Sequence, residues 1–151
     1  MHISSDDIKL KVEASDWQEA IRKGGELLVA SGFVCERYID AMINAVHEHG
    51  PYIVLTPGVA IPHARSESGV IETGISLITL KEPVDFLDSE NNPVNIVICL
   101  AAADKSAHLD ILKDLSFILG SEENVVLLKE ADDVEEVLAL LNQDSSERMV
   151  Q

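Results

Sequence analysis

Residues 74–100 of the chain read GISLITLKEPVDFLDSENNPVNIVICL, and this stretch decides the expected fold. Its two ends, residues 74–80 and 94–100, are rich in β-branched side chains, which is typical of strands that are buried in a sheet. The ENNP sequence at residues 90–93 favours a turn between them. The stretch therefore predicts two buried strands at the centre of the molecule.

On the N-terminal side, apolar residues recur first at the spacing of a strand and then at the spacing of helices. Ser15 and Gln18 form an expected capping box at the start of the first helix. The predicted elements are a strand at 8–13, a helix that ends by Gly32 and a helix at 35–49, followed by short apolar runs at 52–55 and 59–61.

On the C-terminal side, a helix is predicted to begin near Ser106 and to end at Gly120. Residues 125–128 predict a last strand, and Asp132 is expected to cap a final helix. The polar residues 142–151 are expected to form a frayed tail. Strands that alternate with helices predict a single α/β domain over residues 1–151, with a central mixed sheet and helices on both sides.

The composition narrows the class of protein. The chain has 151 residues, 46% of them hydrophobic, and a formal net charge of −16 at pH 7. This charge argues against binding to nucleic acid or to an anionic membrane, and it favours a basic protein as partner. The chain has no apolar signal segment, and Cys35 and Cys99 are expected to be buried thiols of a reducing compartment. We therefore expect a cytoplasmic protein.

The most informative motif is TPGVAIPHAR at residues 56–65. Residues 49–64 contain no Asp, Glu, Lys or Arg, and the run holds His63 directly after Pro62. A neutral imidazole is nucleophilic near pH 7 and is a suitable carrier for a phosphoryl group. A histidine in this setting is also compatible with a purely structural role, so residue chemistry alone leaves both readings open.

Phosphoryl transfer also needs hydrogen-bond donors for the phosphoryl oxygens. Arg65 and His108 are the candidates, because His108 is expected in the first turn of a helix, where free backbone N–H groups favour an anion. The alternatives are that His108 is a hydrogen-bonded core histidine and that Arg65 pairs with Glu67 on the surface.

Two motifs together resemble a known family. VAIPHA at residues 59–64, followed about 45 residues later by His108-Leu109 at the start of a Leu-rich helix, resembles the enzyme IIA proteins of the bacterial phosphoenolpyruvate-dependent sugar phosphotransferase system, in the mannitol/fructose-type superfamily. GPYIV at residues 50–54, PHAR at 62–65 and DWQEAI at 16–21 are most similar to the ascorbate-type branch. Mannitol, fructose or galactitol remain alternatives.

The resemblance implies a phosphorelay. The small basic-faced carrier HPr would pass a phosphoryl group to His63, and His63 would pass it to a cysteine of an enzyme IIB that works with a membrane enzyme IIC. No metal or organic cofactor is implied. Many family members have an arginine sixteen residues before the active histidine; His47 stands there in this chain and is a candidate auxiliary group. Whether the protein forms a homodimer stays open.

Two other functions compete with this interpretation. One is a regulatory IIA-like protein, of the nitrogen type or linked to transcription, which would carry the same motif. The other is a metal-binding protein that uses a cluster of histidines. The four histidines available for such a cluster are His47, His49, His63 and His108.

Overall fold

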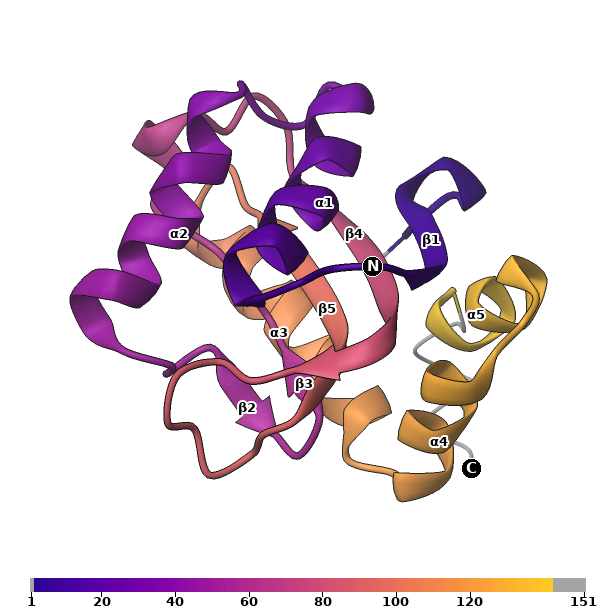
Figure 1. The fold of residues 1–151 in the computed structure, drawn as a ribbon. Coiled ribbons are helices and arrows are strands. Elements are labelled where there is room, and N and C mark those ends of the chain that lie inside the picture. The colour runs from indigo at the N-terminus through magenta and orange to yellow at the C-terminus, as the bar shows by residue number, and fades with distance from the viewer. Residues whose placement is uncertain (1, 143–151) are drawn as a thin grey trace.

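A computed structural model of the protein describes residues 2–142, in which five strands form one mixed sheet in the order β1-β4-β5-β3-β2 (Figure 1). The central pair, β4 and β5, is antiparallel, and β1 and β3 run parallel to β4 and β5, respectively. The strands are β1 (Ile8–Val12), β2 (Val54–Thr56), β3 (Val59–Ala60), β4 (Gly74–Val84) and β5 (Val94–Ala101).

The two strands predicted from residues 74–100 are confirmed as the centre of the sheet. The register places Gly74 opposite Ala101 and Ile78 opposite Val97. Residues 74–80 and β5 are buried apart from the half-buried Asn95, whereas residues 81–83 are exposed. β4 extends beyond the predicted strand to Val84, where it pairs again with Val94. Because both faces of these strands are covered, residues 74–80 and 94–101 are mainly apolar and do not alternate with polar residues, although Ser76 and Thr79 are buried polar exceptions.

Helices cover both faces of the sheet, as the sequence predicts. In Figure 1, α1 and α2 lie in front of the sheet and α3 lies behind it. Each face has its own apolar core, in which Tyr38 belongs to one cluster and Leu115 to the other. The helices are α1 (Trp17–Ala30), α2 (Arg37–His49), α3 (Lys105–Leu119), α4 (Glu122–Glu130) and α5 (Val134–Leu141), with 3-10 turns η1 (Ser5–Asp7) and η2 (Ser66–Ser68).

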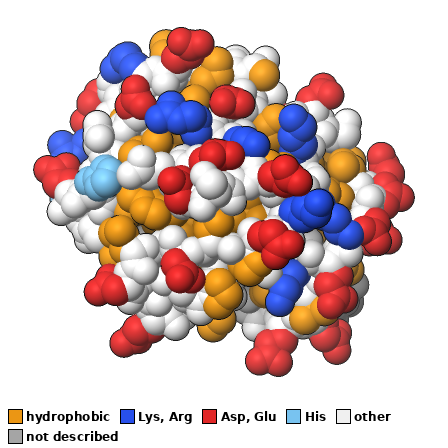
Figure 2. Space-filling model, in the orientation of Figure 1, with side chains coloured by type: hydrophobic (Ala, Val, Ile, Leu, Met, Phe, Trp, Pro, Cys, Tyr) orange, Lys and Arg blue, Asp and Glu red, His pale blue; other side chains and the backbone are white. Residues whose placement is uncertain are grey.

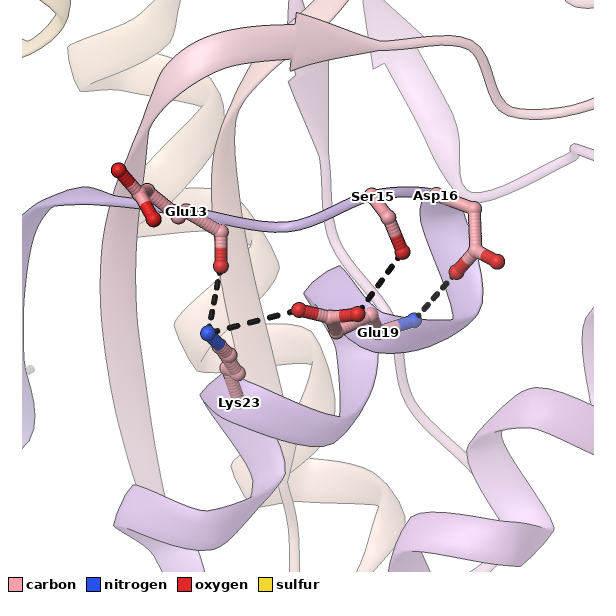
Figure 3. Close-up of polar contacts among 5 residues, drawn as sticks. All are labelled: Glu13, Ser15, Asp16, Glu19 and Lys23. Carbon is pink, nitrogen blue, oxygen red and sulfur yellow. Dashed lines mark hydrogen bonds and ion pairs between the residues drawn. The ribbon is translucent and has the colours of Figure 1, made fainter.

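The N-cap of the first helix lies one residue later than predicted. Asp16 is the N-cap, and its carboxylate accepts a hydrogen bond of 2.8 Å from the backbone N–H of Glu19 (Figure 3). Ser15 instead donates to the Glu19 side chain, and Lys23 reaches both that carboxylate and the Glu13 carbonyl. Aspartate is as good an N-cap as serine, so the sequence offers two neighbouring starts.

The predicted last strand, residues 125–128, is wrong because these residues lie within α4. A short apolar run fits a strand and a helix equally well. Here Ser121 caps the helix through the backbone N–H of Asn124, and Glu122 and Glu123 occupy the first turn, where the helix dipole favours acidic groups. The residues that favour a helix here, Ser121 and the two glutamates, precede the apolar run.

Smaller boundaries also differ from the prediction. The final helix is capped by Asp133 and not by Asp132. Cys35 lies before α2 and is exposed, whereas Cys99 is buried as expected. Asn142, the first residue of the predicted tail, is tied to Ile3 by two hydrogen bonds of 3.0 and 2.8 Å. The remainder of that tail, residues 143–151, lies outside the described residues.

Candidate active site

His63 lies where the carboxyl ends of two parallel strands, β3 and β5, reach the same edge of the sheet. This edge is a common place for ligand sites in α/β proteins. The chain stays attached to β5 after β3 ends, because the Leu100 N–H donates to the Pro62 carbonyl at 2.9 Å. His63 is therefore presented from a backbone that is pinned to the centre of the sheet.

The hydrogen bonding of His63 determines which ring nitrogen is free. Its Nδ1 lies 2.9 Å from the carbonyl oxygen of Ile61. A carbonyl can only accept a hydrogen bond, so Nδ1 carries the proton and Nε2 keeps its lone pair in the neutral ring. The local turn thus holds the imidazole in the tautomer whose Nε2 lone pair is free.

Burial lowers the pKa of His63 below its ordinary value of 6.5. The hydrogen bond to the Ile61 carbonyl raises this pKa, and the neighbouring His108 lowers it further. The net decrease keeps His63 neutral at pH 7, which is the state in which an imidazole is nucleophilic.

His108 is brought directly to His63, although the two residues are far apart in the sequence. Their ring centroids are 5.0 Å apart in an edge-to-face arrangement. His108 belongs to the first turns of α3, whose N-cap Asp104 accepts a hydrogen bond from the Ala107 N–H at 2.8 Å. The N-terminal end of α3, with its positive dipole, therefore lies beside the predicted nucleophile.

Tyr52 is a neighbour of His63 that the motif analysis did not single out. Its ring centroid lies 5.8 Å from that of His63 and 6.0 Å from that of His49. The side chain remains 43% exposed, so it lies at the mouth of the site. The signals in the sequence were its position within the uncharged run of residues 49–64 and within the GPYIV stretch at residues 50–54.

One wall of the pocket in front of His63 comes from α2 and is uncharged except for Glu48, and the rim of the pocket is charged. Ala41, Asn44 and Ala45 form part of the wall. Arg65 and Lys105 bring positive charge to the rim, and Lys105 is a second cation that the sequence analysis missed. Three carboxylates also line the pocket, from Glu48, Glu67 and Asp104.

Arg65 lines the pocket, but its guanidinium is free to move. Its side chain is 87% exposed, and Nη1 lies 4.0 Å from Oε1 of Glu67. This is the surface pair with Glu67 that the sequence offered as an alternative. Such exposed pairs hold their partners weakly, so Arg65 is able to turn toward an anion in the pocket.

His47, the expected auxiliary group, lies outside the pocket. Its ring packs against Trp17 at a centroid distance of 5.1 Å, and its Nε2 lies 3.3 Å from the side-chain nitrogen of Gln18. The side chains of consecutive helix residues point in directions about 100° apart around the helix axis. Glu48 lines the pocket, so its neighbour His47 points away from His63. The geometry gives an auxiliary role of His47 no support.

The four histidines of the metal-site alternative do not converge, because His47 faces Trp17 while His63 faces His108. Within residues 2–142, no three His, Cys, Asp or Glu side chains are grouped as ligands of a metal ion. In the same part of the chain, no helix is both long and apolar enough to cross a membrane.

A half-buried histidine with a free Nε2 lone pair, beside a second histidine near a helix N-terminus, is the arrangement expected of a phosphoryl-transfer site. The model of one family, described as "Phosphoenolpyruvate-dependent sugar phosphotransferase system, EIIA 2", matches residues 1–144. The chain belongs to this enzyme IIA family, which confirms the resemblance found in its two motifs, and it is a phosphoryl-transfer component of a sugar phosphotransferase system.

Individual relatives agree with this assignment. The ascorbate-specific EIIA component of Escherichia coli (strain K12) is 41% identical over 140 residues, which cover 92% of this chain and 91% of the relative. The crystal structure of the mannitol IIA protein from E. coli has a TM-score of 0.83 at 31% identity and covers 93% of this chain and 99% of its own. The structure of the E. coli mannitol IIA protein in complex with phosphorylated IIB has a TM-score of 0.82 at 30% identity. The match covers 92% of this chain and 96% of that one.

The lowered pKa of His63 predicts how stability depends on pH. Between the lowered pKa of the folded protein and the ordinary 6.5, the unfolded chain binds more protons, so the free energy of unfolding should fall as the pH falls through this window. Urea unfolding between about pH 5 and 8, the range in which histidines titrate, measures this slope. A His63→Gln variant should show a shallower slope, and equal slopes in the two proteins would contradict the prediction.

Proposed function

We propose that His63 accepts a phosphoryl group from phosphorylated HPr on Nε2 and passes it to a cysteine of an enzyme IIB. The observation that carries this proposal is the 2.9 Å contact between His63 Nδ1 and the Ile61 carbonyl, which leaves Nε2 unprotonated. Membership of the EIIA family supports the direction of the relay. In the complex of the related mannitol protein, the partner of IIA is a phosphorylated IIB.

The transfer needs no proton to leave the site. The Nε2 lone pair of His63 attacks phosphorus, a new N–P bond forms, and the N–P bond to the donor histidine breaks with its electron pair returning to that histidine. The Nδ1 proton stays on His63, where the Ile61 carbonyl accepts its hydrogen bond and stabilises the charged ring. In the second step, a thiolate of IIB attacks phosphorus and His63 regains its lone pair.

The groups around His63 are suited to hold the phosphoryl oxygens. His108 lies in contact with the ring, and the dipole of α3 favours negative charge at the same place. Arg65 and Lys105 at the rim add positive charge. Because His108 is partly buried and Arg65 is exposed, we assign the main stabilising role to His108 and a smaller one to Arg65.

The surface charge supports a basic donor protein. Figure 2 shows acidic side chains spread over the face that it presents, with fewer basic ones among them. The whole chain has a formal net charge of −16. A field of this sign accelerates the encounter with a basic protein face, such as that of HPr, without a specific contact for each charge.

We further propose that the system transports ascorbate, together with a membrane enzyme IIC. The identity of 41% to the ascorbate-specific component of E. coli supports this substrate over mannitol, for which the related IIA structure is 31% identical. The substrate itself does not enter this domain. The choice is made by which IIB accepts the phosphoryl group from His63.

A panel of purified IIB proteins tests the proposed function. Phosphoenolpyruvate with a labelled phosphoryl group, enzyme I and HPr should label the chain with one acid-labile, base-stable group. An ascorbate-type IIB should then remove the label at least about tenfold faster than mannitol- or galactitol-type IIB, a preference of about 1.4 kcal/mol. Labelling that no IIB removes would favour the regulatory alternative, and a preference for another IIB would replace the substrate.

A further inference from the structure

The hydroxyl of Tyr38 joins two parts of the active-site edge. Tyr38 lies in the first turn of α2, and its side chain is fully buried. The hydroxyl oxygen accepts a hydrogen bond of 3.0 Å from the backbone N–H of Ala64, the residue that follows His63. The hydroxyl donates to the Leu100 carbonyl at 2.7 Å, and the Ala64 carbonyl lies 3.2 Å from the same oxygen.

These bonds make Leu100 the common anchor of both peptide groups beside His63. The Leu100 N–H holds the carbonyl of Pro62, before His63, at 2.9 Å. The Leu100 carbonyl holds the N–H of Ala64, after His63, through the Tyr38 hydroxyl. Leu100 in the central strand β5 therefore holds the backbone on both sides of His63. It bonds directly to Pro62 and, through the Tyr38 hydroxyl, to Ala64.

We propose that Tyr38 is a positioning residue for phosphoryl transfer: by linking Ala64 to Leu100, its hydroxyl fixes the loop that holds the His63 ring in its reactive tautomer. This inference rests on the proposed role of His63 as acceptor. Tyr38 acts through the backbone, because its hydroxyl bonds to main-chain groups of Ala64 and Leu100. The imidazole orientation depends on the Ile61 carbonyl, two residues before His63, so a displaced loop also weakens that contact.

Burial raises the pKa of Tyr38 to about 12. The hydroxyl therefore keeps its proton through the working range of a phosphohistidine relay and remains able to donate to the Leu100 carbonyl. The link is thus constant with pH, unlike a link made by a histidine or a carboxylate. A phenylalanine fills the same volume without the hydroxyl, so it removes the link while keeping the packing of the ring.

The test compares Tyr38→Phe with Ser76→Ala. Ser76 also has a buried hydroxyl that donates to a carbonyl at 2.7 Å, but its partner is Gly24 in α1, so it holds a helix to β4 and not the His63 loop. We expect Tyr38→Phe to slow labelling from phosphorylated HPr by about tenfold, since small misplacements of reacting groups are costly. Ser76→Ala should leave the rate unchanged, although both variants lower the urea midpoint.

Nitrogen-15 NMR of the unphosphorylated protein separates positioning from stability. Wild type and Ser76→Ala should show His63 with the proton on Nδ1, and Tyr38→Phe should show a growing share of the Nε2–H tautomer. An unchanged tautomer and an unchanged rate in Tyr38→Phe would overturn the proposal. In wild type, the Ala64 amide should be protected from hydrogen exchange. Loss of that protection only in the variant supports the link, and an unprotected amide in wild type overturns it even if the variant does not fold.

The same measurements distinguish this inference from the proposed function. If wild type is not labelled at His63, the acceptor role fails, whatever the tautomer in the Tyr38→Phe variant. If wild type is labelled and Tyr38→Phe behaves like Ser76→Ala in rate and in tautomer, the acceptor role stands and the positioning role of Tyr38 fails.

Discussion

Replacement of His63 by Ala is expected to abolish labelling of the chain by phosphoenolpyruvate, enzyme I and HPr. The reason is that His63 supplies the only nitrogen we assign as nucleophile, its Nε2, and alanine offers no atom that could form the N–P bond. Because the side chain is only partly buried, the variant should still fold. The measurement is incorporation of the acid-labile label, with circular dichroism as the check on folding.

The matched control is His47→Ala. His47 is an exposed histidine of the same chain that packs against Trp17 and does not line the pocket. The His47→Ala protein should be labelled to the same extent as wild type. A His63→Ala protein that still takes up one phosphoryl group would refute the acceptor role. A strong loss in His47→Ala would restore the auxiliary role that the sequence comparison suggested and that the geometry does not support.

Replacement of His108 by Ala is expected to slow phosphoryl transfer by about 100- to 1,000-fold, which is the usual effect of removing one preorganised donor to a developing negative charge. His108 is the side chain in ring contact with His63, and it stands at the positive end of α3. The measurement is the initial rate of labelling by phosphorylated HPr. The final extent of labelling should change much less, since the nucleophile remains.

Two comparisons make the His108 result specific. Arg65→Ala should slow the transfer by about fivefold or less, because an 87% exposed guanidinium is screened by water. The rates should be compared near pH 8, since removal of His108 also removes one cause of the low His63 pKa. At this pH the His63 ring is neutral in both proteins. Equal effects of His108→Ala and Arg65→Ala would contradict the assignment of His108 as the main stabilising group.

The local pattern of the sequence was sufficient for most of the secondary structure. The strands at residues 74–80 and 94–100 were recognised because burial on both faces demands continuous apolar runs. Residues 125–128 were assigned wrongly because a run of four apolar residues has no period that separates strand from helix, and the deciding Ser121 cap lies outside it. Cys35 was expected to be buried because the helix was started too early; the exposed residue precedes Arg37, where α2 begins.

The candidate site was predicted in part. Pro62-His63 and the histidine at the start of a later helix were visible as motifs, and the fold brings their rings to 5.0 Å. Residues 49–64 contain no carboxylate. Glu48, Glu67 and Asp104 nevertheless line the same pocket as His63, because neighbouring segments of the fold bring them there. A charge-free run in the sequence is therefore not a charge-free surface.

What the sequence by itself determined is the family, the apolar centre of the sheet and the two histidines, because these are encoded in short patterns of neighbouring residues. What only the tertiary structure decided is the free nitrogen of His63, the outward position of His47 and the link from Ala64 through Tyr38 to Leu100. The first depends on the backbone turn between Ile61 and His63. The other two depend on tertiary packing, because α1 and α2 bring Trp17 to His47, and the start of α2 brings Tyr38 to Leu100. The packing of a helix on a sheet is set by the whole core, and no local pattern contains it.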